Sequence, residues 1–370
     1  MKKAIAFVSA MLLAMSMTAC GSGSSDNAGS QASTGSAASE SQASTGSAES
    51  ESGSSASGSE SAGADSSSEA AAAGDGTVYQ IGICQLVQHE ALDAATQGFK
   101  DALTELMGEG NVEFSEQNAS GDSATCATII NQFVSSDVDL ILSNGTAALQ
   151  AAAAGTDTIP ILGTSITDYG TALDMSDWSG TTGRNISGTS DLAPLQEQAD
   201  MLHELFPDAE NVGILYCSAE ANSAYQAENV QAALEEYGYS CGVYTFADSN
   251  DIASVVTTAS SECDVIYIPT DNTAASNTEV INNICLPAGV PIIAGEQGIC
   301  SGCGVATLSI DYYDLGYKTG EMAYEILVNG ADITTMEVAT ADATTKKYDA
   351  DRCAELNIEV PDDYVAIEEE

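Results

Sequence analysis

The chain has 370 residues and is strongly acidic, because 55 Asp and Glu stand against 8 Lys and Arg and the formal net charge is −47 at pH 7. Two of the basic residues, Lys2 and Lys3, lie at the N-terminus, and the others are scattered as Lys100, Arg184, Lys318, Lys346, Lys347 and Arg352. Nucleic-acid binding depends on basic patches that neutralise phosphates, so this composition argues against nucleic acid as a partner.

The N-terminus has the pattern of an export signal. A charged start, an apolar run over residues 4–15 and Met17-Thr18-Ala19 precede Cys20. Such a short run is typical of a signal peptide rather than a spanning helix, so we predict a signal peptide over residues 1–19. The spacing resembles a bacterial lipobox, which implies that Cys20 is lipidated and anchors the protein to a membrane surface. Ordinary secretion with an incidental cysteine is the alternative.

Residues 21–76 consist almost entirely of Ser, Gly, Ala and Glu. A segment with so few large apolar side chains cannot bury enough surface to offset the entropy of ordering, so we predict a disordered, acidic tether. Residues 20–76, the lipidated cysteine and its tether, would then hold a folded domain away from the membrane.

From residue 78 onward, short apolar runs typical of buried strands alternate with amphipathic helical patterns. In the first half, strands are predicted at 78–84, 112–114, 138–142, 159–162 and 186–189, and helices at 91–107, 123–134 and from 147. In the second half, helices are predicted at 195–206, 221–237, 252–260, 274–285 and 313–327, and strands at 212–216, 242–246, 264–268, 291–294 and 305–310.

Two successive strand–helix series of similar length predict an α/β protein with two doubly wound, parallel-sheet lobes and a cleft between them. Late elements of such a chain can cross back to the first lobe. We therefore predict a first lobe of residues 78–192 plus about 295–327, and a second lobe of residues 193–294 plus about 328–370. We expect the protein to be a monomer.

Three predicted strands end in polar turns, at residues 143–146, 163–168 and 269–273. Ligands of open α/β sheets bind at the carboxyl ends of the strands, so these turns predict a polar pocket. Helix capping or turn formation is the alternative for each of these residues taken singly.

The polar turns indicate which ligand groups they would bind. Arg184 is the only basic residue near a predicted strand end, so a ligand carboxylate would depend on helix N-terminal N–H groups and on neutral side chains, namely Asn144, Thr146, Thr164, Ser165 and Thr167. Asp271 would face an ammonium group in a charge-assisted hydrogen bond. An α-amino acid carries both groups.

The sequence shows no catalytic pattern. It has no Gly-x-Gly-x-x-Gly after the first predicted strand, no Walker loop and no Gly-x-Ser-x-Gly elbow. The two histidines are His89, on a predicted strand-end loop that suits a ligand contact, and His203, in an amphipathic helix. Without a nucleophile and its base, we expect a binding protein and not an enzyme.

Cysteine usage does not indicate a metal site. Apart from Cys20 the chain has nine cysteines, without the spacing of metal ligands, and Cys300 and Cys303 are the only close pair. We expect no metal or other cofactor. The close pair would form a local disulfide in an oxidising compartment, and buried free thiols are the alternative.

Several segments between residues 78 and 370 carry a family pattern when they are taken in order. They are 85–93 (QLVQHEALD), 117–122 (QNASGD), 164–168 (TSITD), 185–191 (NISGTSD), 220–223 (EANS), 269–276 (PTDNTAAS) and 311–316 (DYYDLG). This combination resembles the ABC-transporter substrate-binding lipoproteins of the tryptophan/tyrosine-binding type. The resemblance implies a type I periplasmic-binding-protein fold that closes on a small ligand, here an aromatic amino acid, and delivers it to a membrane permease with a cytoplasmic ATPase.

The resemblance also implies roles for single residues. The ligand carboxylate would contact Thr164, Ser165 and Thr167, and polar groups of the second lobe would come from Asn222 and Asp271. Near the ligand side chain, the pocket would be lined by Gln85, His89 and Leu92. This chain departs from the family pattern at Asn144-Gly145-Thr146 and at the Cys300–Cys303 pair. A tethered sensor without a transport role, and a binder of a sugar or nucleoside, are the alternatives.

Overall fold

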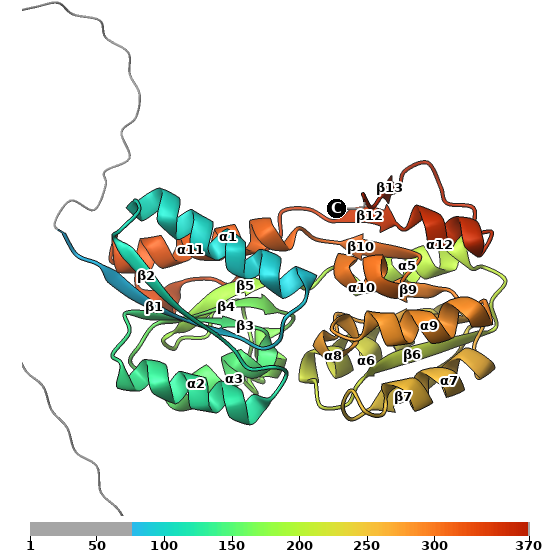
Figure 1. Ribbon diagram of the computed structural model, residues 1–370, viewed down its shortest axis with the longest axis horizontal. Helices are drawn as coiled ribbons and strands as arrows, with labels where there is room; N and C mark the ends of the chain where they lie inside the picture. The colour runs from blue at the N-terminus through green and yellow to red at the C-terminus, as the bar shows by residue number, and fades with distance from the viewer. Residues whose placement is uncertain (1–75, 369–370) are drawn as a thin grey trace, which may run out of the picture. The chain divides into compact units, whose positions relative to one another are not determined.

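The computed structural model describes residues 76–368, which form two lobes, each built from two separate stretches of the chain (Figure 1). The predicted signal peptide (1–19), Cys20 and nearly all of the predicted tether (20–76) lie outside the described residues. Within the described part of the chain, no helix is both long and apolar enough to cross a membrane.

The first lobe is a six-stranded sheet with helices on both faces. Its strands are β1 (Tyr79–Gln85), β2 (Val112–Asn118), β3 (Leu140–Asn144), β4 (Ile161–Ile166), β5 (Ile186–Ser190) and β11 (Ala339–Thr340). Its helices are α1 (Glu90–Met107), α2 (Ser123–Ser135), α3 (Thr146–Gly155), α4 (Tyr169–Ala172), α11 (Tyr312–Leu327) and the 3₁₀ turn η1 (Ile333–Thr335).

The second lobe is a seven-stranded sheet, also covered by helices. Its strands are β6 (Asn211–Cys217), β7 (Ser240–Phe246), β8 (Val265–Ile268), β9 (Ile292–Ala294), β10 (Ala306–Ser309), β12 (Thr345–Tyr348) and β13 (Val365–Ala366). Its helices are α5 (Leu195–Leu205), α6 (Ala221–Tyr237), α7 (Ile252–Glu262), α8 (Asn272–Ala275), α9 (Thr278–Ala288), α10 (Gln297–Cys303) and α12 (Ala350–Glu355). The single helix predicted over 274–285 is therefore two, α8 and α9.

Both sheets have the same central strand order, which is β5-β4-β3-β1-β2 in the first and β10-β9-β8-β6-β7 in the second. All neighbours within these orders are parallel. This is the doubly wound arrangement in which helices connect successive parallel strands. The predicted fold class, an α/β protein with two parallel-sheet lobes, is confirmed.

Successive side chains of a strand point to opposite faces of the sheet, so each sheet has a hydrophobic core on both faces. In β3, Leu140 and Leu142 pack with Phe99 of α1, while Ile141 packs with Ile130 of α2 on the opposite face. The second lobe repeats the pattern, with α5 and α6 on one face and α7, α9 and α10 on the other. Because both faces are buried, the strands are continuous apolar runs in the sequence, which is why they were predictable.

Three segments connect the lobes, at residues 191–194, 310–311 and 341–344. The predicted crossovers near 295 and 328 are wrong, because β10 pairs with β9 and β12 in the second sheet and β11 pairs with β5 in the first. Residues 295–309 thus belong to the second lobe, and residues 328–340 extend the first. The pairing of β10 with β12 joins strands 36 residues or more apart in the antiparallel sense, and a local pattern carries no signal for it.

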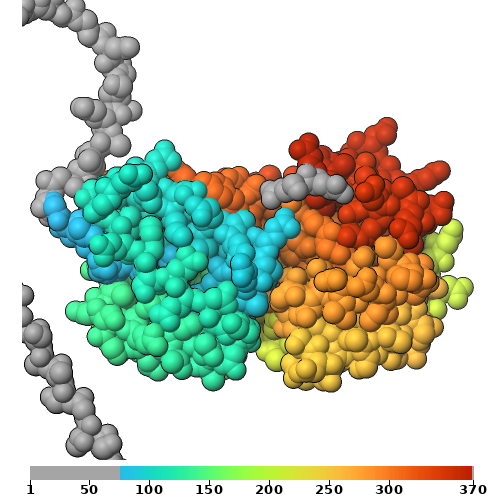
Figure 2. Space-filling view, in the orientation of Figure 1, coloured from blue at the N-terminus to red at the C-terminus, as the bar shows by residue number. Residues whose placement is uncertain are grey.

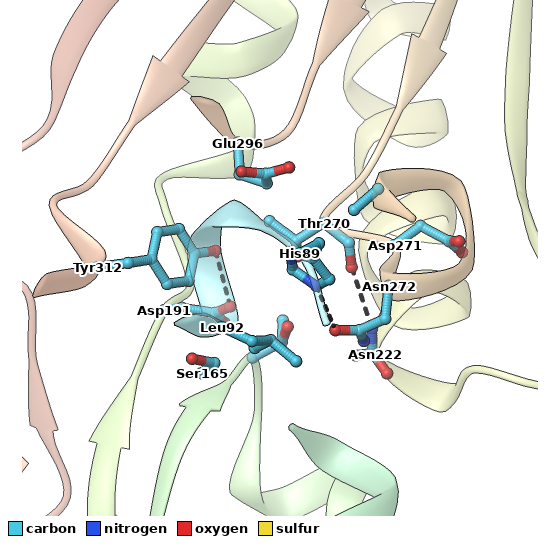
Figure 3. Close-up of a pocket in the computed structure, with 12 residues that line it drawn as sticks. His89, Leu92, Ser165, Asp191, Asn222, Thr270, Asp271, Asn272, Glu296 and Tyr312 are labelled. Atoms are coloured by element: carbon cyan, nitrogen blue, oxygen red, sulfur yellow. Dashed lines mark hydrogen bonds between the residues drawn. The ribbon is translucent and has the colours of Figure 1, made fainter. Parts of the chain in front are cut away.

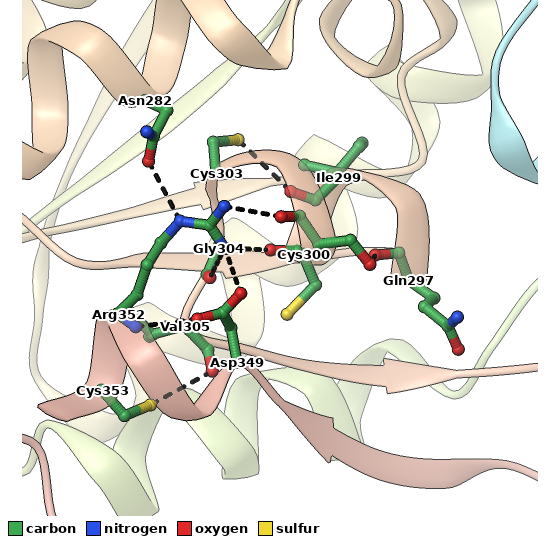
Figure 4. A network of polar contacts seen from close by, with 11 residues as sticks. Asn282, Gln297, Ile299, Cys300, Cys303, Gly304, Val305, Asp349, Arg352 and Cys353 are labelled. Atoms are coloured by element: carbon green, nitrogen blue, oxygen red, sulfur yellow. Dashed lines mark hydrogen bonds and ion pairs between the residues drawn. The ribbon is translucent and has the colours of Figure 1, made fainter. Parts of the chain in front are cut away.

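The guanidinium group of Arg352 binds helix α12 to the end of helix α10 within the second lobe (Figure 4). Arg352 of α12 pairs with Asp349 and donates to the carbonyl oxygens of Cys300, Ser301 and Gly304 at the end of α10. The Cys300 carbonyl also accepts the N–H of Gly304, and the guanidinium group supplies donors to the carbonyl oxygens exposed at this helix end. Cys300 and Cys303 are both buried free thiols in α10, and no disulfide joins them.

Helices α1 and α11 cross with their backbones in contact. A Cβ atom at Gly316 would lie 1.9 Å from the carbonyl oxygen of Ala95, and one at Gly98 would lie 2.1 Å from that of Tyr313. Only glycine permits this approach, which fixes the returning helix α11 to the first lobe and leaves residues 310–311 as a short connection.

We expect Gly316→Ala to lower the free energy of unfolding by about 1–3 kcal/mol, because the methyl group forces the two helices apart. Alanine gains roughly 0.5–1 kcal/mol over glycine in a helix, so the steric cost must exceed that gain. The control is Glu321→Ala, on the exposed face of the same helix. Urea unfolding of both variants checks this, and equal stability of Gly316→Ala and the wild type would contradict the close contact.

Candidate functional site

A small cavity lies where the two lobes meet. Figure 2 shows the seam between the lobes on one face of the molecule. Its lining comes equally from both lobes (Figure 3). The first lobe and its connections supply His89, Leu92, Ser165, Thr167, Asp191 and Tyr312, and the second lobe supplies Asn222, Thr270, Asp271, Asn272, Ala275 and Glu296. The volume open to the centre of a water-sized sphere is about 10 Å³, room for about one water molecule.

The lining residues follow the carboxyl ends of parallel strands. His89 follows β1, Asp191 follows β5, Glu296 follows β9 and Tyr312 follows β10. The carboxyl edge of each sheet faces the other lobe, and this edge is the usual ligand site of doubly wound sheets. The cavity is therefore the candidate ligand site.

The end of β4 is locally strained at Ser165. Its φ is +55°, a left-handed value that is uncommon outside glycine, and the pairing with β5 shifts register between Gly163 and Ile166. The buried Ser165 hydroxyl has no hydrogen-bond partner. Such strain accumulates at ligand sites, where it aims a side chain that a regular strand would point elsewhere.

Residues at the start of helix α6 form hydrogen bonds with the turn that follows β8. Glu220 accepts hydrogen bonds from the backbone N–H groups of Asn272 and Thr273, at 3.0 and 2.8 Å. Asn222 donates to the carbonyl oxygen of Thr270 at 3.0 Å. The second-lobe wall is thus fixed by contacts within that lobe.

Asp271 is 1 % exposed, and both of its carboxylate oxygens serve the backbone. Oδ1 accepts from the N–H of Ala274 and Oδ2 from that of Cys217, each at 2.7 Å. The carboxylate points away from the centre of the cavity in Figure 3. Burial and the nearby Glu220 raise the pKa of Asp271 to about 8. The arrangement makes Asp271 a helix cap that joins β6 to the turn. The contact with a ligand ammonium stays a prediction.

Asp191 has a different environment. Its Oδ2 accepts a hydrogen bond from the Tyr312 hydroxyl at 3.0 Å, and its Oδ1 is buried without a hydrogen-bond partner. Burial raises the pKa of Asp191, and the contacts with Tyr312 and Thr167 oppose that effect. In Figure 3 the Asp191–Tyr312 pair faces the cavity from the connections between the lobes.

Glu296 completes the acidic side of the cavity. Its carboxylate caps α10 by accepting from the N–H groups of Gly298 and Ile299, at 2.5 and 2.6 Å. Burial raises the pKa of Glu296 to about 7, and the charges of Glu90 and Asp191 act in the same direction.

Hydrogen bonds cross directly between the lobes. His89 Nε2 lies 3.2 Å from Asn272 Oδ1, and Gln226 donates to the Thr167 hydroxyl at 3.3 Å. Burial lowers the pKa of His89, which favours the neutral ring. These contacts hold the lobes together around the cavity.

The fold and the site agree with comparisons to known proteins. The family model described as "ABC transporter substrate binding protein" matches residues 80–369. The chain belongs to this family. A curated relative, the "Tyrosine-binding protein" of Clostridioides difficile, is 34% identical over 266 residues, which cover 71% of this chain and 76% of the relative.

Two solved structures of substrate-binding proteins are also similar. An ABC domain from Streptococcus pneumoniae in complex with L-Trp is 31% identical, with a TM-score of 0.74 over 77% of this chain and 97% of that one. The ligand-free, open structure of a substrate-binding protein with adhesive properties from Clostridium difficile is 34% identical, with a TM-score of 0.61 over 79% of this chain and all of that one (100%). The TM-score is higher against the L-Trp complex than against the open, ligand-free protein, although the sequence identity is lower.

The protein thus has the type I periplasmic-binding-protein fold and is an ABC-transporter substrate-binding protein. Proteins of this family bind small ligands, work with ABC permeases and are extracytoplasmic. The family consists of solute-binding proteins and is not a class of enzymes. Among the described residues no cluster of His, Cys, Asp and Glu has the arrangement of a metal site.

The structure brings together part of the predicted site. Lining the cavity are His89, Leu92, Ser165, Thr167, Asn222 and Asp271, whereas Gln85, Asn144, Thr146 and Thr164 are buried behind it. Gln85 and Asn144 both bond to the Thr96 hydroxyl of α1, at 2.6 and 2.9 Å. A buried amide must find such a partner, and the nearest helix supplies it.

Six lining residues were missing from the predicted site, namely Asp191, Thr270, Asn272, Ala275, Glu296 and Tyr312. Asp191, Glu296 and Tyr312 follow predicted strands directly, so the rule that selected the other turns also applies to them. Asp191 and Tyr312 were present in the segments that carry the family resemblance, but no site role was drawn from them.

We expect Asp271→Ala to lower the free energy of unfolding by about 2–4 kcal/mol, because it removes a helix cap and leaves the buried N–H of Cys217 unpaired. The matched control is Asp122→Ala, since Asp122 caps α2 through Thr125 but is exposed. Asp122→Ala should lower the free energy of unfolding by about 0.5–2 kcal/mol. Denaturant unfolding measures both, and equal losses would contradict the buried second role of Asp271.

We expect Glu296 to make stability depend on pH. Burial raises the pKa of Glu296 from the ordinary value of 4.5 to about 7 in the folded protein. The folded state therefore binds more protons than the unfolded state between these pH values, and stability falls as pH rises through this range. Glu296→Gln removes this contribution, so the variant should gain stability relative to the wild type between about pH 4.5 and 8. Thermal unfolding across that range measures the difference, and a constant offset would show that Glu296 is ionised throughout.

Proposed function

We propose that this protein captures an aromatic amino acid, tyrosine or tryptophan, outside the cytoplasm and delivers it to an ABC importer, a permease with its ATPase. The observation that carries the proposal is the cavity between the lobes, lined from both sides by strand-end residues. The names of the two similar proteins, a tyrosine-binding protein and a domain in complex with L-Trp, support an aromatic ligand.

The cavity offers both polar and apolar surface to such a ligand. Ser165 and Thr167 bear hydroxyls that suit a carboxylate, as do the N–H groups in the first turn of α1, which has no side-chain cap. Leu92, Ala275 and the ring of Tyr312 provide apolar surface for an aromatic side chain. Since the cavity is now about one water in size, the lobes must part before a ligand enters.

Closure gives the ligand its role in transport. A ligand that contacts both walls favours the closed arrangement by its difference in affinity for the closed and open forms. The permease would then recognise the closed protein. We further propose that lipidation at Cys20 and the 20–76 tether keep the protein, as a monomer, within reach of the membrane.

We expect L-tyrosine or L-tryptophan to raise the melting temperature of the purified full chain, because a ligand that binds only the folded state stabilises it. At 100 times the Kd the gain is about 2.7 kcal/mol. Sugars and nucleosides should produce no shift. A shift with only a sugar or nucleoside would contradict the amino-acid proposal and leave the family assignment standing.

A matched pair of histidine variants tests the site in the same screen. His89→Ala should weaken ligand binding by about 3–30-fold, the equivalent of roughly 0.5–2 kcal/mol for a lost hydrogen bond between the lobes. His203→Ala is the control, since His203 lies in α5 against Tyr237 and Tyr239 and does not line the cavity. Equal effects of the two variants would place the ligand elsewhere.

A further inference from the structure

The charge around the cavity is one-sided. Its lining includes the carboxylates of Asp191, Asp271 and Glu296 and, within the part of the chain that the structure describes, no Lys or Arg. Several basic side chains are paired elsewhere: Lys100 with Glu116, Lys318 with Asp342, Lys346 with Glu204 and Asp363, and Arg352 with Asp349. Since the Asp271 carboxyl group points away from the cavity and is bound to backbone N–H groups, the ligand meets chiefly Asp191 and Glu296, and no neighbouring cation cancels their charge when they are ionised.

Three buried polar atoms of the lining have no partner, namely Asp191 Oδ1, His89 Nδ1 and Ser165 Oγ. Asp191 is only 6 % exposed, so its free oxygen is poorly solvated. Asn272 uses its amide nitrogen to donate to Glu220 at 2.7 Å and therefore presents its oxygen to His89 Nε2. The Nε2 atom must then carry the proton of the neutral ring, which leaves Nδ1 as an acceptor.

We propose that this site selects its ligand by a primary ammonium group and does not require the carboxylate, so that arylalkylamines bind as well as aromatic amino acids. The inference rests on the proposed function, because it concerns the same cavity. An ammonium group has three N–H donors. Asp191 Oδ1, His89 Nδ1 and the Ser165 hydroxyl are three acceptors around one small space, and Asp191 provides the opposite charge.

The ligand carboxylate has no charged partner in the cavity, only neutral hydroxyls and the uncapped first turn of α1. Ser165 and Thr167 offer neutral hydroxyls, and hydrogen bonds from neutral donors lack the strength that a cation adds. The Thr167 hydroxyl already accepts from Gln226. The ligand carboxylate also carries the same charge as Asp191 and Glu296. A ligand without a carboxylate therefore loses hydrogen bonds but avoids this repulsion.

Calorimetry at pH 7.5 with three matched ligands on the full chain tests the proposal. The series is L-tyrosine, tyramine and 3-(4-hydroxyphenyl)propionate, or L-tryptophan, tryptamine and indole-3-propionate if tryptophan binds more tightly. We expect the amine to bind within about 30-fold of the amino acid, and the acid without an ammonium to bind more than about 30-fold more weakly, a step of about 2 kcal/mol.

A charge-removing variant adds a second readout. Asp191→Asn keeps an oxygen to accept the Tyr312 hydroxyl but removes the charge, and it should weaken both the amino acid and the amine by more than about 30-fold. Asp122→Asn, an exposed cap whose replacement also caps well, is the control and should change neither affinity. The melting temperature of each variant without ligand shows whether it folds, and the three-ligand series on the wild type decides the matter if Asp191→Asn does not.

The outcomes separate this inference from the proposed function. If the amino acid binds while the amine is more than about 30-fold weaker, or if the acid binds as tightly as the amino acid, ammonium selection is wrong and amino-acid capture stands. Unchanged affinities in a folded Asp191→Asn variant would also overturn it. If neither the amino acid nor the amine binds, the proposed function fails and the inference fails with it.

Discussion

Parallel strands leave all their carboxyl ends at one edge of a sheet, and in this protein the two sheets turn those edges toward each other. The polar residues that follow the strands are thereby excluded from water and must find partners. Glu220 and Asn222 satisfy the turn after β8, and the Thr96 hydroxyl satisfies Gln85 behind the cavity. Seven buried side-chain atoms in the described part of the chain have no partner, and three of them, on His89, Ser165 and Asp191, line the space where the lobes meet. These unpartnered atoms distinguish the candidate ligand site from a second core.

The contacts between the lobes differ in kind from those within them. Inside the first lobe, α1 and α11 meet backbone to backbone around Gly316. Across the cavity, the direct bonds are His89 to Asn272, Gln226 to Thr167 and Gln297 to Glu90. A bond of this type contributes about 0.5–1.5 kcal/mol net, so the lobes can separate without either core opening. The free-energy difference between the open and closed forms is then small enough for one bound ligand to reverse it.

The sequence predicted most of this fold because strands buried on both faces are unmistakable apolar runs. It misplaced the lobe crossovers, since the pairings of β10 with β12 and of β5 with β11 join distant segments with no local pattern. Strand-end position led to Ser165 and His89, which line the cavity between the lobes. Position alone did not distinguish residues that face the cavity from those such as Asn144 that bond to the helix behind it. That choice depends on which backbone and side-chain donors lie within reach in three dimensions.

Asp271 and Asp191 illustrate that choice most directly, because both are acidic residues just beyond a parallel strand. Asp271 accepts two backbone N–H groups, which oppose the cost of burying its charge but do not cancel it, since burial still raises the pKa of Asp271 to about 8. Asp191 accepts a tyrosine hydroxyl on one oxygen and no hydrogen bond on the other. Its charge is therefore costly until a cation arrives, and the raised pKa of Asp191 reflects that cost. Asp191 lies at the interface between the lobes with one oxygen unpartnered. Only the closed form places this carboxylate and the second-lobe wall around the same ligand, so under the proposed ammonium selection the positive charge of the ligand favours closure.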